Sequence, residues 1–195
     1  MTPSTPKRTP DRRRPRSPWL LAWALVGLSL GVAAAPAPSV LEVRALYLYN
    51  FSLFIEWPTT AFESKSQPLE YCVAGNHKLH QILGKLLAGE TAGGRPLHLK
   101  PVEHRQWRNC HLLYLDRSLG EERSKILDQV QGAPVLTVGD SRHFVVTGGM
   151  VALVRKGRRV RPVVDLAAVK AVGIRISSKL LRLSELIDGR EEGRP

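Results

Sequence analysis

The fold class of this chain is decided by the stretch LEYCVAGNHKLHQILGKLL at residues 69–87. Residues 69–74 alternate in the manner of a strand, and Gly75 and Asn76 form a turn signal after it. Residues 77–87 then place their leucines and one isoleucine on a single side at helical spacing. A strand that leads directly into a helix is the repeating unit of α/β proteins.

The same alternation continues on both sides of this stretch. A helix is expected from Glu42 to Trp57, ended by Pro58. Residues of one mostly apolar and aromatic face recur at spacings of three and four: Val43, Leu46, Tyr47, Asn50, Phe51 and Phe54. Further strands are expected at 96–101, 110–115, 134–138, 150–154 and 160–164, and further helices at 119–130, 166–171 and 179–187. We therefore expect an α/β single-domain sandwich with a largely parallel central sheet, an antiparallel hairpin edge and flanking helices.

The first 35 residues have the order of a secretory signal peptide. Basic residues between Lys7 and Arg16 precede an apolar core at 19–32, and small residues follow it. The core is about 14 residues long, whereas a membrane-spanning helix needs roughly 20; an uncleaved membrane anchor is the alternative. We expect cleavage near 34–37, a domain over 36–187, a disordered tail over 188–195 and a location in the periplasm.

The charge of the chain is strongly basic, with 29 Lys and Arg against 17 Asp and Glu and a formal net charge of +12. Export argues against nucleic acid as the partner of this charge. Five basic residues lie in the run from Arg155 to Arg161. That run is either the solvated turn of a hairpin or a patch that meets an acidic membrane or an acidic partner.

The chain has two cysteines, Cys72 and Cys110. In an exported protein a pair of cysteines is typical of one disulfide. A metal pair or a reactive thiol is the alternative, although no histidine lies at a C-x-x-C or C-x-x-H spacing.

Motifs for catalysis are missing from the sequence, which contains no nucleophile elbow, phosphate-binding loop or paired-histidine zinc motif. Asp140 follows a predicted buried strand, where α/β sheets often carry functional groups, but capping of a loop is the simpler role. Gly148 and Gly149 indicate a turn. We expect a binding or regulatory domain that is not an enzyme and uses no metal or cofactor.

Four segments resemble the YfiR family (DUF4154). Residues 47–58, YLYNFSLFIEWP, are similar to its opening aromatic helix and W-P pair. Residues 110–114, CHLLY, resemble its "C-H-I-L-F" strand. The run LTVGD with Phe144 and GGMV, within 136–151, and ISSKLLRL at 176–183 match its later motifs in the same order.

The resemblance implies a periplasmic α/β protein that binds the periplasmic part of a membrane-bound diguanylate cyclase and holds it inactive. It also implies release by an outer-membrane lipoprotein or a redox change, and a homodimer. The candidate partner- or ligand-binding residues are Tyr47, Phe51, Phe54, Trp57, Asp140 and Phe144. Aromatic residues at this helical spacing are more often core than interface. The alternative function is a periplasmic small-ligand-binding accessory protein linked to an outer-membrane receptor.

Two departures from the family pattern bear on these expectations. Cys72 and Cys110 match one of the family's two disulfides, whereas residues 143–152 contain no cysteine for the second. Redox control through a second bridge is therefore not expected. Pro162 stands in the strand expected at 160–164, and because proline has no N–H to donate, we expect that strand at a sheet edge.

Overall fold

The first helix, α1 (Val40–Phe54), begins at a capping box. The Ser39 hydroxyl accepts from the backbone N–H of Glu42, and the Glu42 carboxylate accepts from the N–H of Ser39 at 2.6 Å. These contacts come from a computed structural model, which describes residues 37–101 and 105–187. Contacts between residues divide the chain into the units Met1–Ala37 and Pro38–Pro195, and only the second is described below. The expected signal peptide and tail lie outside the described residues.

The end and the buried face of α1 differ from the sequence-based expectation. The helix stops at Phe54, short of Pro58, because the next residues form the strand β1 (Ile55–Glu56), which pairs antiparallel with β9 (Arg175–Ile176). Leu46 was expected on the apolar face but is exposed. The buried residues of α1 are Arg44, Ala45, Leu48, Phe51 and Ser52.

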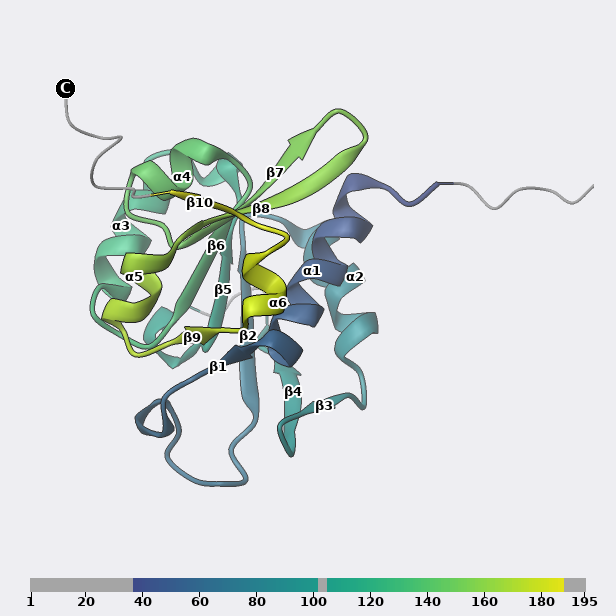
Figure 1. The fold of residues 1–195 in the computed structure, drawn as a ribbon. Coiled ribbons are helices and arrows are strands. Elements are labelled where there is room, and N and C mark those ends of the chain that lie inside the picture. The colour runs from purple at the N-terminus through teal and green to yellow at the C-terminus, as the bar shows by residue number, and fades with distance from the viewer. Residues whose placement is uncertain (1–36, 102–104, 188–195) are drawn as a thin grey trace, which may run out of the picture. The chain divides into compact units, whose positions relative to one another are not determined.

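Eight strands form one sheet in the order β10-β8-β7-β6-β5-β2-β4-β3 (Figure 1). Their bounds are β2 Leu69–Ala74, β3 Thr91–Ala92, β4 Arg95–Leu99, β5 Leu112–Leu115, β6 Leu136–Gly139, β7 Val151–Lys156, β8 Arg159–Asp165 and β10 Glu185–Ile187. The five strands from β7 to β4 run parallel, while β7 and β8 form an antiparallel hairpin. The expected largely parallel sheet with an antiparallel hairpin is confirmed.

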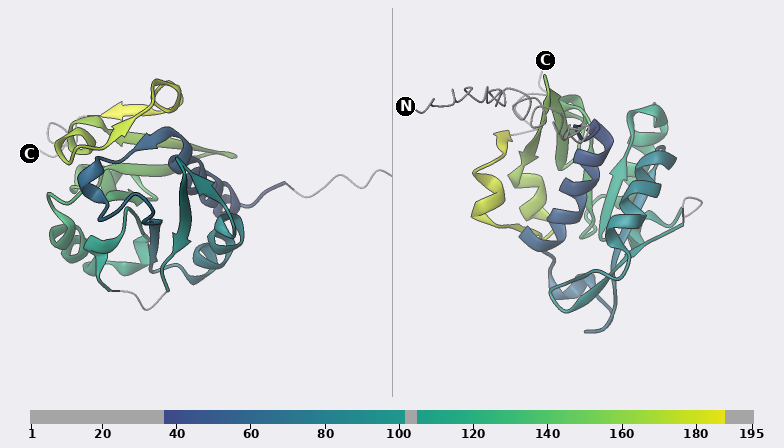
Figure 2. Two further views of the ribbon diagram at one scale, coloured as in Figure 1. Left: turned by 90° about the horizontal axis from the view of Figure 1, so that it is seen from below. Right: turned by 90° about the vertical axis from the view of Figure 1, so that its right-hand side faces the viewer.

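The sheet has an apolar core on each face because residues on its strands alternate between the two sides. One core packs against α1, α2 (His77–Leu87) and α5 (Leu166–Ala171). The other packs against η3 (Trp107–Asn109), α3 (Glu122–Val130) and α4 (Arg142–Val146), and it contains both cysteines. Figures 1 and 2 show α1 and α2 side by side, and Figure 1 places α3 and α4 across the sheet from them.

The C-terminal helix expected at 179–187 is wrong. A single turn, α6 (Ser178–Leu181), is followed by β10, which pairs parallel with residues 163–165 of β8. Asp165 donates its N–H to the backbone oxygen of Met150, just before β7, so by alternation the nitrogen of Pro162 points away from β7. The expectation that this strand lies at a sheet edge is wrong, because β10 lies outside β8 in the sheet. Pro162 directly precedes residues 163–165, which pair with β10.

A close approach between helix α4 and the sheet explains two glycines. The ring of Phe144 is fully buried between Gly139 and Gly149. A Cβ atom added at either glycine would lie 2.3 Å or 2.2 Å from the nearest ring carbon. Gly149 is therefore required by packing, whereas its neighbour Gly148 has a φ of +100° and fits the expected turn.

Candidate functional site

Asp140 lies directly after β6 and is the centre of a buried ion cluster. Its side chain is only 2% exposed. Arg117 donates from Nε to Oδ2 at 2.5 Å, Arg44 Nη2 lies 3.8 Å from Oδ2, and Arg123 Nη1 lies 3.9 Å from Oδ1. Three guanidinium groups thus surround one carboxylate.

The three arginines come from separate elements. Arg44 is on α1, Arg117 on η4 (Arg117–Leu119) after β5, and Arg123 on α3. Arg44 also donates to the backbone oxygen of Asp140 at 3.5 Å. The hydrogen bond and charge of Asp140 raise the pKa of Arg117. The cluster therefore fastens α1, η4 and α3 to the carboxyl end of β6.

This cluster lies where α/β sheets usually bind ligands. The chain passes from β2 to β4 on one side and then returns to β5 on the other side of β2, so the topology switches between β2 and β5. Ligands of open α/β sheets bind outside the carboxyl ends at such a point. There the side chain of Asn76 donates to Asp116 at 2.8 Å, and burial of Asp116 is outweighed by hydrogen bonds from Asn76 and Ser118, which lower its pKa. A cavity of about 330 Å³ adjoins, lined by Asn76, Leu119 and Glu122 among others.

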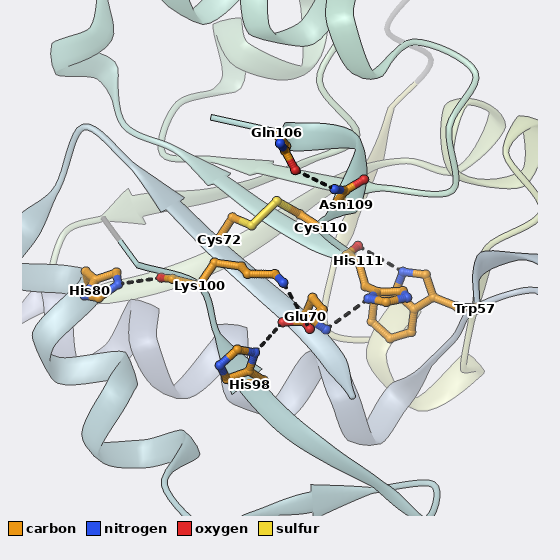
Figure 3. Close-up of a disulfide and its surroundings, with 10 residues drawn as sticks. All are labelled: Trp57, Glu70, Cys72, His80, His98, Lys100, Gln106, Asn109, Cys110 and His111. Atoms are coloured by element: carbon orange, nitrogen blue, oxygen red, sulfur yellow. Dashed lines mark hydrogen bonds and ion pairs between the residues drawn. A yellow bond between two sulfur atoms is a disulfide. The ribbon is translucent and has the colours of Figure 1, made fainter. Parts of the chain in front are cut away.

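A larger cavity, of about 580 Å³, lies at the opposite end of the same strands. Its lining includes Phe62, Glu70, Lys100, Arg108 and His111, together with Cys110 of the disulfide. The disulfide joins Cys72 of β2 to Cys110 before β5, with 5.9 Å between the Cα atoms, as expected from the sequence (Figure 3).

His111 is buried beside this disulfide and uses both ring nitrogens. Nδ1 accepts the backbone N–H of Glu70 at 2.9 Å, so it carries no proton, and Nε2 donates to the backbone oxygen of Ala61 at 3.0 Å. The backbone oxygen of His111 accepts from the indole nitrogen of Trp57 at 3.0 Å (Figure 3). Phe62 stacks on the imidazole at a centroid distance of 4.4 Å. Burial lowers the pKa of His111, which fits a neutral ring with a fixed tautomer.

Glu70 brings a buried carboxylate to the wall of the same cavity. Its side chain is 10% exposed and is held by His98 at 2.6 Å and Lys100 at 3.2 Å (Figure 3). His98 lies on β4, the strand next to β2, and Lys100 directly follows β4. Cationic groups of Lys100 and Arg108 thus face the cavity together with one carboxylate.

The structure does not gather the residues singled out from the sequence into one site. Phe51 and Phe144 are core residues, with exposed fractions of 1% and 0%. Phe54 is half-buried against the α1 side of the core. The half-buried Trp57 holds the backbone of His111, and Asp140 is the centre of the arginine cluster at the other end of the sheet.

Tyr47 lies on a surface groove. It is half-buried, its hydroxyl donates to the backbone oxygen of Val160 at 3.2 Å, and its ring adjoins several arginines of the hairpin. The core interpretation of the aromatic face thus fits Phe51 and Phe144, and a surface role remains for Tyr47.

Sequence reasoning missed Arg44, Arg117, Arg123 and His111. Arg44 falls on the helix face that packs inward, an unusual position for a charged residue, and this is the signal that could have found it. His111 directly follows Cys110, but spacing alone does not reveal that each of its nitrogens meets a backbone group.

Within residues 37–101 and 105–187, no cluster of three or more His, Cys, Asp or Glu side chains has an arrangement that would hold a metal ion. No helix in the described part of the chain has the length and apolar character needed to cross a membrane.

Comparison with known proteins decides the family. The sequence profile of YfiR/HmsC-like proteins matches residues 41–185, most of the chain and nearly all of the domain. The chain belongs to the YfiR/HmsC-like family. The Trp57–Pro58 pair, the Cys110–His111 pair and the Phe144 segment of this YfiR/HmsC-like protein are the motifs whose packing is described above.

Solved structures support the fold of this YfiR/HmsC-like protein but no more. A conserved domain protein from Vibrio cholerae is similar with a TM-score of 0.52 and 11% identity over 75% of this chain and 59% of the other. An ABC domain from Streptococcus pneumonia, solved in complex with L-Trp, is similar with a TM-score of 0.50 and 8% identity, over 74% of this chain and 60% of the other. The chain thus spans less than two thirds of either structure. A search of curated proteins found no match.

Proposed function

We propose that this protein is a non-enzymatic periplasmic regulator that binds the periplasmic part of a membrane-bound diguanylate cyclase and represses it. The observation that carries the proposal is the YfiR/HmsC-like match over residues 41–185, because this family suggests a regulator of cyclic-di-GMP signalling. We propose that an outer-membrane lipoprotein releases the cyclase from this repression.

The state of the titratable groups supports a role without catalysis. A general base must be free to take a proton from a substrate. The Asp140 carboxylate is held by three arginines, and each ring nitrogen of His111 is bonded to a backbone group. Both residues therefore serve to fasten elements of the fold.

The disulfide supports a location outside the cytoplasm. Cys72 and Cys110 are bridged, and disulfides persist in oxidising compartments such as the periplasm. The basic, apolar and small-residue order of the first 35 residues agrees with export.

An exposed apolar stripe on α1 supports binding to another protein. Leu46 and Leu53 are 44% and 52% exposed and lie seven residues apart, on the same side of the helix. A partner that packs on this side of α1 would cover both leucines.

The proposal is tested by reconstitution of the reaction that is regulated. A full-length membrane-bound diguanylate cyclase from the same organism, in detergent or proteoliposomes, is assayed for conversion of GTP to cyclic-di-GMP with increasing amounts of the oxidised, exported protein. Turnover should fall in a saturable manner. An unrelated periplasmic protein serves as the control, and turnover that stays constant at saturating protein would contradict the proposal.

A small-ligand-binding accessory role is the second candidate, favoured by the cavity beside His111. Its volume of about 580 Å³ lies within the range of roughly 300–1,000 Å³ that is usual for ligand sites. Lys100 and Arg108 would suit an anionic metabolite. Native mass spectrometry of protein purified from the periplasm should then show a bound mass that disappears in a Lys100→Ala variant, and a spectrum of the bare chain alone would remove this candidate.

A further inference from the structure

A second groove, of about 470 Å³, lies between α1, β8 and the connection from α6 to β10. Four arginines line it and define what we name the arginine groove: Arg158, Arg159 and Arg161 from the hairpin, and Arg182 from the end of α6. All four are exposed. Figure 1 shows the β7–β8 hairpin that carries three of them extending beyond the neighbouring strands.

The positive charge of the arginine groove is not neutralised within the described part of the chain. None of its four arginines has a carboxylate partner among residues 37–101 and 105–187. The carboxylate of Glu185, on nearby β10, forms ion pairs with Arg142 and Lys156. By contrast, the arginines around Asp140 and the exposed Arg175 are all paired. Guanidinium groups favour carboxylates and phosphates because their planar N–H groups bind two oxygens at once.

Apolar side chains also line the arginine groove. They are Val43 and Tyr47 of α1 and Leu183, which is the most exposed large apolar side chain in the described structure, at 68%. A ligand that fits therefore combines negative charge with an apolar group. A peptide segment with interspersed acidic and apolar residues has this combination.

The backbone of β8 at the groove does not offer the free N–H and C=O groups that an added strand would need. The outward carbonyl of Val160 already accepts the Tyr47 hydroxyl at 3.2 Å, Pro162 has no N–H, and β10 covers residues 163–165. A bound segment must therefore be held by side chains, and the arginines supply them.

We propose that the arginine groove is the docking site for an acidic segment of a protein partner. The carboxylates bind Arg159, Arg161 and Arg182, and an apolar side chain packs on Tyr47 and Leu183. A groove lined by both arginines and apolar side chains favours a peptide over a flat lipid surface. The identification of this partner as the cyclase rests on the proposed function.

The test compares two double variants with the same change in net charge. Arg159→Glu/Arg182→Glu alters the groove, whereas Lys125→Glu/Lys170→Glu alters exposed positions on α3 and α5. Binding of a fluorescein-labelled peptide built from Glu-Leu-Glu units is measured by anisotropy, and folding of both variants is checked by melting temperature. The groove variant should bind at least about tenfold more weakly than wild type, since two ion pairs are replaced by repulsion. The control variant should bind like wild type.

Several outcomes would overturn the assignment. Equal weakening in both variants would indicate attraction by net charge alone, and no binding by wild type would remove the groove as a peptide site. Arginine-dependent binding to phosphatidylcholine vesicles that contain phosphatidylglycerol, without peptide binding, would make the groove a membrane contact.

A cellular assay separates failure of the groove from failure of the proposed function. In a deletion strain, the control variant should restore repression of cyclic-di-GMP and the groove variant should not. If a groove variant that has lost the peptide still represses fully, the groove is not the docking site and the regulatory function stands. If the peptide binds as expected but the deletion leaves cyclic-di-GMP unchanged, the regulatory function fails and the groove stands.

Discussion

Removal of the Cys72–Cys110 disulfide should lower the stability of the domain by an amount set by the loop that it closes. The two cysteines are 38 positions apart, and the entropy of closing such a loop in the unfolded chain corresponds to about 4 kcal/mol at 25 °C. Each kcal/mol shifts the melting temperature by roughly 2–4 °C in a domain of this size, so reduction should lower it by about 10 °C. Both cysteines are buried, with exposed fractions of 1% and 2%, so reduced thiols still fill the same space.

Thermal unfolding followed by circular dichroism tests this value. Oxidised protein is compared with protein that was reduced in denaturant and refolded with reductant, and with Cys72→Ala/Cys110→Ala. Cys72→Ser should also melt several degrees lower, because a free thiol and a buried hydroxyl replace the bridge. Reductant should leave the melting temperature of the double alanine variant unchanged. Equal melting of oxidised and reduced wild type would refute the view that the bridge stabilises the fold.

Three further predictions concern buried groups. Burial lowers the pKa of His111, so as the pH falls the unfolded chain binds a proton at this residue, near pH 6.5, before the folded chain does. The free energy of unfolding measured in urea should therefore decrease as the pH falls below about 6.5. The decrease should be smaller in His111→Asn. Asp140→Asn should cost about 3–5 kcal/mol, because Arg44 is left buried without its charge partner, and a chemical denaturation midpoint equal to wild type would contradict the cluster. Gly149→Ala should destabilise by more than about 2 kcal/mol because its Cβ would overlap a buried ring, whereas Gly84→Ala, inside α2, should be neutral or stabilising by about 0.5–1 kcal/mol.

The strands and helices with a strong local pattern could be predicted from the sequence. The strand at 69–74 and the helix at 77–87 have the predicted bounds because alternation, turn signal and helical spacing all agree there. The segment after Ser178 was predicted as a helix from its leucines, but Leu183 and Leu186 are exposed. Its residues 185–187 pair with a strand about 20 positions earlier in the chain, and local spacing contains no information about that pairing.

The candidate sites were harder to predict because they depend on contacts between distant residues. Asp140 was singled out for its position after a strand, yet its arginine partners lie up to 96 positions away. From the sequence, the basic run at 155–161 is either a solvated hairpin turn or a patch for an acidic partner. Only the fold brings Arg182 and Tyr47 beside it, so that arginines and apolar side chains line one groove.

The most direct test of the proposed repression is the cellular level of cyclic-di-GMP. It is measured by mass spectrometry in the wild type, in an in-frame deletion, and in deletion strains that express either the full chain or a chain without residues 1–35. The proposal predicts that the deletion raises cyclic-di-GMP and biofilm, and that only the full chain restores the low level, because the cyclase is met in the periplasm. Unchanged cyclic-di-GMP in the deletion strain, or full restoration by the chain without its export segment, would contradict it.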